Sequence, residues 1–415
     1  MTTNLLRKNE KQNVDLVLLL TDISALLCLI VFFAFRYSGD FTLTLSQLAF
    51  LLMSLLYAYL RGLKINILFL WAAAFYGFCA LSTLWAYTPA GSGRLAAYSL
   101  KSLSMIFSVL LYADTKRNAN ILVWGFIIGA AILAIRLLIN TPLEEFGAKR
   151  LGEAIDFNEN TVGMLFLYSA AISLYFTKKS KWFFAVFLLS TVFVLLSGSR
   201  KSAVMIVALL LISFFNKIEK PVHMLYIIPF GAAIAALIYL VFNNEQLYHL
   251  VGRRFEFLFN YFSGEGEVGS STFIRMSLID IGVTQFKEKP ILGYGFNNFR
   301  YMNDFRTYAH NNFIELLVNT GIVGTVLFYS AHLFILVKAA IIWFTKTREV
   351  IIAIMFLAII LICDYGAVSY YNEITLAVLA LSYKLVVLTD NEKAVEPHSH
   401  KMVSNAKSHT QRTVT

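Results

Sequence analysis

Apolar runs close to the length of a membrane-spanning helix fill most of this chain. A helix needs roughly 17–25 apolar residues to cross the hydrocarbon core of a bilayer. Runs of this length or slightly shorter lie at 14–35, 41–60, 65–86, 96–113, 119–139, 160–177, 182–197, 201–215, 222–242, 313–341, 349–366 and 374–389. Hydrophobic residues make up 58% of the chain and charged residues 14%, which excludes an ordinary soluble domain. The sequence therefore predicts a polytopic integral membrane protein with about 12 transmembrane helices.

The uniform apolar character of these runs predicts the fold class. Strands of a membrane β-barrel would alternate apolar and polar residues over about ten positions, whereas these runs are longer and do not alternate. We expect an all-α fold with nine helices in 1–242, one large extracytoplasmic loop at 243–312 and three further helices in 313–389. Residues 390–415 contain few apolar side chains, so we expect a disordered cytoplasmic tail there.

Lysine and arginine residues predict how the chain is oriented. Basic residues in short connections stay on the cytoplasmic side of a membrane. Here they fall in every second connection, at Arg7, Lys8, Lys11, Arg61, Lys64, Lys116, Arg117, Lys178, Lys179, Lys181, Lys217, Lys220, Lys338, Lys346 and Arg348. Both termini would then be cytoplasmic. The outer connections would be 36–40, 87–95, 140–159, 198–200, 243–312 and 367–373.

Charge and cysteine content exclude several other functions. The net charge of +10 follows from the topology, and it does not indicate nucleic-acid binding, because the basic residues form no stripe with interleaved aromatics. Cys28, Cys79 and Cys363 lie inside apolar runs and have neither disulfide nor metal-ligand spacing, so we expect no metal or other cofactor. No small-residue cleavage pattern follows the first run, which we expect to be retained as a span.

A tight polar turn, Ser197-Gly-Ser-Arg200-Lys201, separates two apolar runs on the predicted outer side. The run after it is short for a span, so we expect the turn to lie below the outer surface. Serine and glycine favour helix N-termini, where free N–H groups and a guanidinium together bind an anion. An arginine that only reaches the lipid headgroups is the alternative interpretation of Arg200.

The 243–312 segment is longer than a connection needs to be. Its basic and acidic residues balance, and its middle, 272–286, has the pattern of a helix that lies on the membrane or on the ends of the spans. This middle helix contains Arg275. We expect the segment to roof a cavity.

His310 stands at the outer end of the tenth run. An imidazole titrates near neutral pH and can accept a proton from a hydroxyl group, although a histidine that caps the next helix or faces water is the alternative. Asn311 and Glu315 form a polar entry to the run, and Glu315 is placed one turn inside it, where it would orient His310. Asp22 and Lys101 are ionisable residues within apolar runs, which makes them candidate functional residues. The alternative is that both lie close enough to a helix end to reach water.

Four motifs follow one another in the predicted outer positions. They are the Ser-Gly-Ser-Arg200 turn, Arg275, Pro290-Ile-Leu-Gly-Tyr-Gly295-Phe, and His310-Asn311 followed after nine residues by Gly321 and Gly324. Each motif is weak alone, but their order resembles the bacterial O-antigen ligase and O-antigen (polysaccharide) polymerase superfamily. The motifs cover roughly 150–330, and the predicted topology extends the resemblance to the whole chain.

The resemblance implies a GT-C-like fold and metal-independent glycosyl transfer outside the bacterial cytoplasmic (inner) membrane. The donor would be a glycan on undecaprenyl diphosphate. The acceptor would be a second lipid-linked repeat unit in a polymerase, or lipid A-core in a ligase. Membrane lipids, a flippase and a chain-length regulator are the expected partners.

The resemblance also implies which residues act. Arg200, Arg275 and His310 would be catalytic, and we expect Arg150, Lys201, Asn311 and Glu315 to bind substrate. The arginines would stabilise the leaving diphosphate and His310 would be the base. No paired carboxylates suggest a nucleophile, so we expect inversion by direct displacement. Asn158, Asn160, Asp364 and Glu373 are further candidates for hydrogen bonds to sugars.

Three function classes compete at this point. Within the first, the Ser-Gly-Ser-Arg-Lys turn and the His-Asn-Asn-Phe-Ile-Glu segment favour a polymerase over a ligase. The second class is a transporter or lipid-linked oligosaccharide flippase, which would show internal repeats and polar sites at the bilayer midplane. The third is a non-catalytic membrane scaffold, in which the arginines and His310 are ordinary surface residues.

Overall fold

The computed structural model describes residues 2–35, 40–62, 64–146, 150–177, 179–218, 224–225, 227–345 and 347–410. Most of these residues are helical, and they contain no β-strand. The helices are α1 (Thr2–Ala34), α2 (Asp40–Arg61), α3 (Ile67–Leu81), α4 (Pro89–Tyr112), α5 (Lys116–Asn140), α6 (Glu159–Phe176), α7 (Trp182–Leu196), α8 (Arg200–Lys217), α9 (Ile227–Asn243), α10 (Glu245–Leu247), α11 (Arg253–Ser263), α12 (Ser270–Glu288), α13 (Asn312–Ile341), α14 (Arg348–Asp364) and α15 (Glu373–Thr410). The predicted all-α class is confirmed.

Within the described residues, each apolar run marked in the sequence overlaps one of these helices; positions 222, 223 and 226 of the ninth run lie outside them. In the described residues, five segments are both long and apolar enough to cross a membrane: Val14–Ala34, Phe41–Arg61, Ile67–Trp85, Lys116–Asn140 and Asn312–Ile341. Shorter apolar helices lie at Ser99–Tyr112, Trp182–Leu196 and Ile227–Asn243. These features are those of a multi-pass membrane protein, while the number of twelve crossings stays a prediction.

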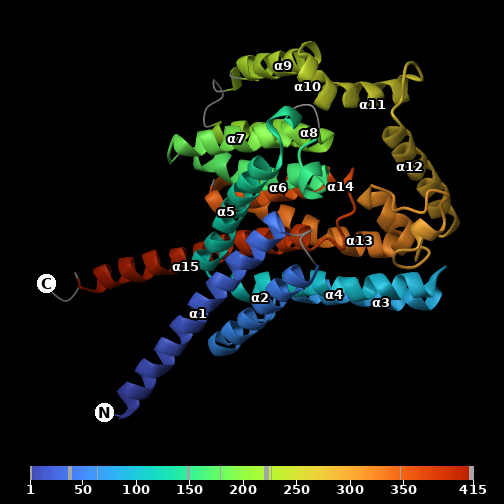
Figure 1. The fold of residues 1–415 in the computed structure, drawn as a ribbon. Helices are drawn as coiled ribbons and strands as arrows, with labels where there is room; N and C mark the ends of the chain where they lie inside the picture. Colours follow the sequence, from blue (N-terminus) through green and yellow to red (C-terminus); the bar gives the residue numbers. More distant parts are fainter. Residues whose placement is uncertain are drawn as a thin grey trace.

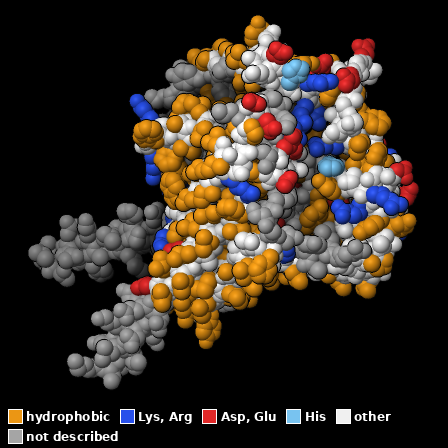
Figure 2. All heavy atoms as spheres, viewed as in Figure 1, with side chains coloured by type: hydrophobic (Ala, Val, Ile, Leu, Met, Phe, Trp, Pro, Cys, Tyr) orange, Lys and Arg blue, Asp and Glu red, His pale blue; other side chains and the backbone are white. Residues whose placement is uncertain are grey.

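The helices pack lengthwise into a bundle whose interior is apolar. α6 packs on α7, α1 packs on α2 and α5, and α14 packs on α15. Phe126 of α5, Tyr168 of α6 and Phe356 of α14 meet in edge-to-face and tilted contacts at centroid distances of 5.4–5.7 Å. Hydrophobic side chains also cover much of the outer face of the bundle, whereas charged side chains gather toward α11 and α12 (Figure 2). An apolar exterior of this kind suits a lipid environment.

The large loop lies at one end of the bundle, and both chain termini point toward the opposite end (Figure 1). Its predicted helical middle is confirmed as α12, which packs on α13. A small second core joins the two elements and consists of Leu278, Tyr294, Phe299, Ala309 and Val318. This core fixes the loop on the end of the bundle.

Two glycines of the loop motifs meet at a break in α13. Gly321 interrupts the helix with φ +62°, and Gly293 has φ +65° in the turn that follows α12. A Cβ atom on Gly293 would lie 2.5 Å from the carbonyl oxygen of Val318, and one on Gly321 would lie 2.2 Å from that of Ile291. The two backbones therefore touch directly, and both positions require glycine for conformation as well as for space.

Helix α15 extends to Thr410. The expected disordered cytoplasmic tail at 390–415 stays a prediction, and 411–415 lie outside the described residues.

A polar cluster ties α1, α4 and α5 together away from the large loop. The carboxylate of Asp22 accepts hydrogen bonds at 3.0 and 2.6 Å from the Arg117 guanidinium, and a further one from the hydroxyl of Tyr112. The Asp22 side chain is 9% exposed, whereas that of Arg117 is 54% exposed. The sequence marks Asp22 as a candidate functional residue, but in the structure its side chain links α1 to α4 and α5.

We expect Asp22→Ala to lower the stability of the bundle by about 1–2 kcal/mol, because the half-exposed Arg117 can return to water after losing its partner. The apparent melting temperature of the purified protein in detergent measures this loss. Glu267→Ala is the control, since it breaks an exposed pair with Arg253 and should change stability by less than about 0.5 kcal/mol. Equal melting temperatures for the two variants would contradict the structural role of Asp22.

Candidate functional site

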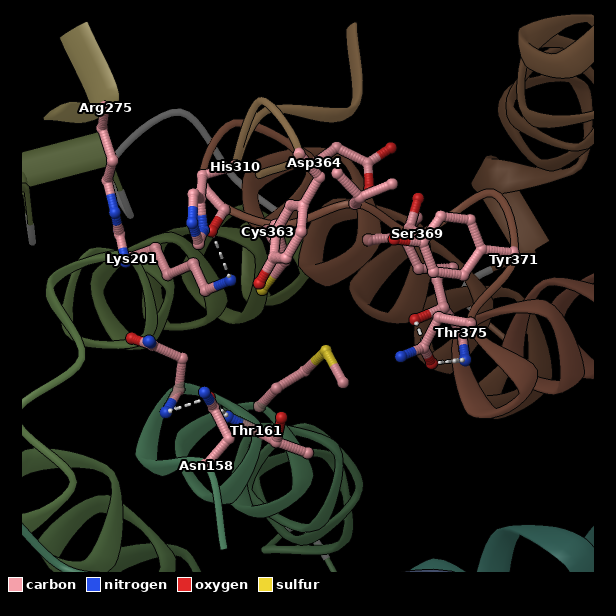
Figure 3. A pocket seen from close by; sticks show the side chains of 18 residues that line it. Asn158, Thr161, Lys201, Arg275, His310, Cys363, Asp364, Ser369, Tyr371 and Thr375 are labelled. Carbon is pink, nitrogen blue, oxygen red and sulfur yellow. Dashed lines mark hydrogen bonds between the residues drawn. The ribbon is translucent and has the colours of Figure 1, made fainter. Parts of the chain in front are cut away.

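A cavity of about 250 Å³ opens at the end of the bundle that carries the large loop. Its wall combines α6, α8, α12, the segment before α13, the end of α14 and the start of α15. The lining residues are Asn158, Asn160, Thr161, Met164, Lys201, Arg275, Tyr308, His310, Ile360, Cys363, Asp364, Gly366, Ala367, Val368, Ser369, Tyr371, Asn372 and Thr375. Figure 3 shows Arg275, Lys201 and His310 on one side of this cavity and Ser369 and Tyr371 on the other. Several connections predicted to lie outside therefore meet at one place.

The turn before α8 brings a helix N-terminus to the cavity. Gly198 has φ +63°, which lets the chain reverse between α7 and α8. Ser199 is the N-cap residue but makes no side-chain capping bond, so the first N–H groups of α8 are not satisfied by the cap. Lys201, in the first turn, donates a hydrogen bond from Nζ to the carbonyl oxygen of Gly366 at 3.2 Å. The start of α8 and the basic side chain of Lys201 therefore lie together at the cavity, while anion binding there stays a prediction.

Four arginines gather beside the cavity. Arg200 donates from Nη1 to the carbonyl oxygen of Arg254 at 2.6 Å and to Thr272 Oγ1 at 3.3 Å, which ties the turn to the large loop. It lies within electrostatic reach of Arg150, Arg254 and Arg275. Arg254 donates in turn to the carbonyl oxygen of Gly198 at 3.4 Å. Of the four, Arg275 lines the cavity directly.

The charge of this arginine cluster is only partly compensated. Arg150 pairs with Glu159 at 3.0 Å, and among the described residues Arg200, Arg254 and Arg275 form no ion pair with a carboxylate. Burial lowers the pKa of Arg275 and of Arg254 below the usual range, and burial together with Arg254 lowers the pKa of Arg150 to about 10. The guanidinium groups remain charged at neutral pH. An excess of positive charge at a half-buried site favours an anionic ligand.

His310 projects into the cavity from a strained backbone position. Its φ of +52° lies in the left-handed region, which few non-glycine residues adopt. Its ring lies 4.1 Å from the ring of Tyr308, centroid to centroid. Burial, together with the smaller effects of the positive charges of Arg275 and Lys201, lowers the pKa of His310 to about 4. The imidazole is therefore neutral at pH 7 and able to accept a proton.

Residues at the start of α13 hold His310 in this position. The buried carboxylate of Glu315 accepts the backbone N–H of Ala309 at 2.6 Å and the amide of Asn319 at 3.0 Å. Asn319 Oδ1 accepts the backbone N–H groups of Asn298 and Phe299 at 2.9 and 2.8 Å. Glu315 and Asn319 thus fasten both parts of the loop that ends at His310.

The structure brings together most of the site residues that the sequence predicts. Arg275, His310 and Lys201 line the cavity, and Arg200 and Arg150 stand beside it. Asn311 does not line the cavity, because its side chain caps α13 by accepting the N–H groups of Phe313 and Ile314.

The remaining predicted candidates lie partly in the cavity wall and partly elsewhere. Glu315 is buried behind the cavity wall and contacts the backbone before His310 instead of its ring. Asn158, Asn160 and Asp364 line the cavity. The lining residues do not include Lys101, Asp22 or Glu373.

Sequence reasoning missed Arg254, Tyr308, Asn319 and Tyr371. Arg254 and Tyr308 lie in the large loop among other charged and aromatic residues, without a spacing that separates them from their neighbours. Asn319 lies in the apolar run of α13, where a buried amide is unusual enough to have been a signal.

Comparison with known proteins agrees with this geometry. Residues 185–329 match the family model described as O-antigen ligase, and this region contains Arg200, Arg275 and His310. No curated protein matches the sequence significantly. The match supports assignment of this multi-pass membrane protein to the O-antigen ligase and polymerase superfamily, which confirms the resemblance. Members of this family are glycosyltransferase-like enzymes that use lipid-linked glycans.

The lowered pKa of His310 predicts a pH profile for transfer. Protonation removes the base, so we expect kcat/KM, which reports the free enzyme, to fall only as pH approaches about 4. A bound anion would offset Arg275 and Lys201 and raise the pKa of His310, so the acidic limb of kcat should lie at higher pH. An acidic limb of kcat that lies at lower pH than the acidic limb of kcat/KM would contradict the assignment of His310 as the base.

The lowered pKa of His310 also affects folding. Because the folded pKa is lowered, the stability contribution of His310 is complete above its ordinary value of 6.5 and is lost as pH falls toward 4.

Glu315 should act by positioning, and its variants separate this from direct binding. Glu315→Ala frees the backbone N–H of Ala309, and we expect kcat to fall about 10- to 100-fold with little change in KM. Glu315→Gln keeps one of the two hydrogen bonds and should lose less. A rise in KM without loss of kcat would instead indicate contact with the substrate.

Proposed function

We propose that this protein is a glycosyltransferase that joins undecaprenyl-diphosphate-linked repeat units into O-antigen or another surface polysaccharide. One observation carries the proposal: a neutral imidazole and incompletely paired cations face the same small cavity. A diphosphate leaving group needs positive charge, and a hydroxyl nucleophile needs a base. The family match supports the same chemistry.

The proposed step is a direct displacement at the anomeric carbon of the donor sugar. His310 takes the proton of the acceptor hydroxyl, and the oxygen forms a bond to the anomeric carbon while the bond from that carbon to the diphosphate oxygen breaks. The electron pair leaves with undecaprenyl diphosphate. Arg275, Lys201 and Arg200, with the N-terminus of α8, stabilise the charge that develops there. A single displacement of this kind inverts the anomeric configuration.

Arginines supply this stabilisation without a metal ion, so we expect transfer to continue in the presence of a chelator. We place the site on the outer face of the bacterial cytoplasmic membrane, with both termini inside. Supporting observations are the alternation of basic residues along the sequence and the position of both termini opposite the large loop. A flippase is an expected partner because lipid-linked units must be delivered to the outer face. A chain-length regulator is an expected partner because the polymer must end.

A ligase that transfers the glycan to lipid A-core is the second candidate. The same donor site serves both reactions, since they differ in the acceptor alone. The description of the matching family as O-antigen ligase favours this candidate, whereas the form of the Arg200 turn and the His310 segment favours a polymerase. A flippase is less well supported, because the polar residues gather at one end of the bundle and not at its middle.

Complementation of a deletion strain tests the proposal. Loss of a polymerase leaves one repeat unit on the lipid core, whereas loss of a ligase leaves lipid-linked polymer and a bare core, and a gel profile of surface polysaccharide separates the two. We expect His310→Ala and Arg275→Ala to leave the deletion phenotype, with activity at least about 100-fold reduced. Lys287→Ala, also on α12 and exposed, is the control and should restore the polymer. Normal polysaccharide with His310→Ala would rule out His310 as the base. Unchanged polysaccharide after deletion of the gene would support a non-catalytic membrane scaffold.

A further inference from the structure

The proposed base is not oriented by a hydrogen bond. Among the described residues, none forms a hydrogen bond with the imidazole of His310. The charged groups that act on it, Arg275 of α12 and Lys201 of α8, are both positive and cannot accept a bond from the ring N–H. Figure 3 shows these three side chains beside one another. A catalytic base is usually oriented by a third group, commonly a carboxylate or a carbonyl oxygen, so the orientation of His310 has to come from another kind of contact.

The ring of Tyr308 lies against the imidazole of His310. The two ring centroids are 4.1 Å apart, and the ring planes meet at 42°. Most aromatic pairs have centroids roughly 4.5–7 Å apart, so these two rings are in direct contact. The torsion about the Cβ–Cγ bond of a histidine is broad unless neighbouring atoms restrict it. The face of Tyr308 blocks rotation of the imidazole in its direction and thereby restricts the orientation of the ring.

The path of the backbone presents both rings to the cavity. Tyr308 and His310 line the cavity, whereas Ala309 between them is buried in the small second core. His310 reaches the cavity from its left-handed backbone conformation, with φ +52°. The two side chains therefore lie on the same side of this segment, and the contact between them is built into the fold of the loop.

Hydrogen bonds hold the backbone on both sides of Tyr308. On one side, Asn303 Nδ2 donates to the carbonyl oxygen of Thr307 at 2.9 Å. On the other side, the carboxylate of Glu315 accepts the backbone N–H of Ala309 at 2.6 Å. Tyr308 also packs against the main apolar core of the bundle. Its ring therefore extends from a fixed backbone, as a support for a precisely placed group requires.

Tyr308 lies close to both functional parts of the proposed site. Its ring contacts His310, and its hydroxyl lies within electrostatic reach of the Arg275 guanidinium. In the proposed step the base and the arginine act on the two bonds that change at one carbon, so their relative placement affects the rate. Tyr308 is thus placed where it sets the direction of the imidazole relative to Arg275.

We propose that Tyr308 is the positioning residue of His310: the face of its ring holds the imidazole in the orientation from which it takes the proton of the acceptor hydroxyl. The inference rests on the proposed function, in which His310 is the base, and it adds the group that orients this base. The ring face carries this role, and the hydroxyl of Tyr308 takes no part in the proton transfer.

Kinetics of the full-length protein in detergent test this role, with lipid-linked repeat units extracted from the deletion strain as substrate. Tyr308→Leu keeps an apolar side chain against the core but has no flat ring, so we expect kcat to fall about tenfold while KM stays within about twofold. Tyr308→Phe keeps the ring and should retain at least about half of kcat. Phe305→Ala is the matched control and should leave kcat unchanged, because Phe305 lies in the same loop, is 39% exposed and is not among the residues that line the cavity.

The pH profile separates positioning from a merely structural role. Burial, with smaller effects from Arg275 and Lys201, lowers the pKa of His310 to about 4. Loss of the ring in Tyr308→Leu lets water reach the imidazole, so its pKa rises toward the ordinary value of 6.5 and the acidic limb of kcat/KM moves to higher pH. Tyr308→Phe and Phe305→Ala should keep the limb of the unmodified protein. A variant that is only destabilised loses active molecules but does not move the limb.

Two results would overturn the positioning role. One is an unchanged kcat with an unshifted acidic limb in Tyr308→Leu, and the other is a loss of kcat in Tyr308→Phe as large as that in Tyr308→Leu. Tyr308→Met, which also lacks a flat ring, takes the place of Tyr308→Leu if that variant does not fold. Either result leaves the proposed function intact, which fails separately if His310→Ala is fully active.

Discussion

Direct backbone contact between the Pro290–Gly295 turn and the break in α13 is the constraint on which the site depends. Tyr294 N–H bonds to the carbonyl oxygen of Val318 at 2.9 Å, and Ile322 N–H bonds to that of Pro290 at 2.8 Å. This contact exists because Gly293 and Gly321 lack side chains and adopt positive φ. The chain between the turn and α13 is thereby pinned at its start, and Glu315 pins it again just before His310.

The electrostatics of the site follow from this rigid frame. Burial removes hydration from these arginines, and Arg150 and Arg275 also meet like charge, as their lowered pKa values indicate. Packing of α12 on α13 and the bonds of Arg200 to the loop offset that repulsion. Burial keeps His310 neutral, and the charges of Arg275 and Lys201 contribute to this, so the anion site and the base are coupled. A ligand that neutralises the cations changes the base as well.

Local pattern predicted a large part of the molecule. The apolar runs, the middle helix of the loop and the residues His310, Arg275 and Lys201 were all identifiable, because span length and residue chemistry are properties of short segments. Asn311 and Glu315 were recognised as polar, but their partners are backbone groups that no spacing displays.

Sequence alone determined the membrane class, the helical fold and the order of the motifs, because these follow from hydrophobicity and from the choice of residue at each position. Tertiary structure decided which side chains share a cavity. Lys201, Arg275 and His310 come from segments far apart in the sequence and line one cavity because the fold packs those segments together. Contacts between residues far apart in the chain depend on packing and on direction in space, and neither quantity is encoded in the local pattern.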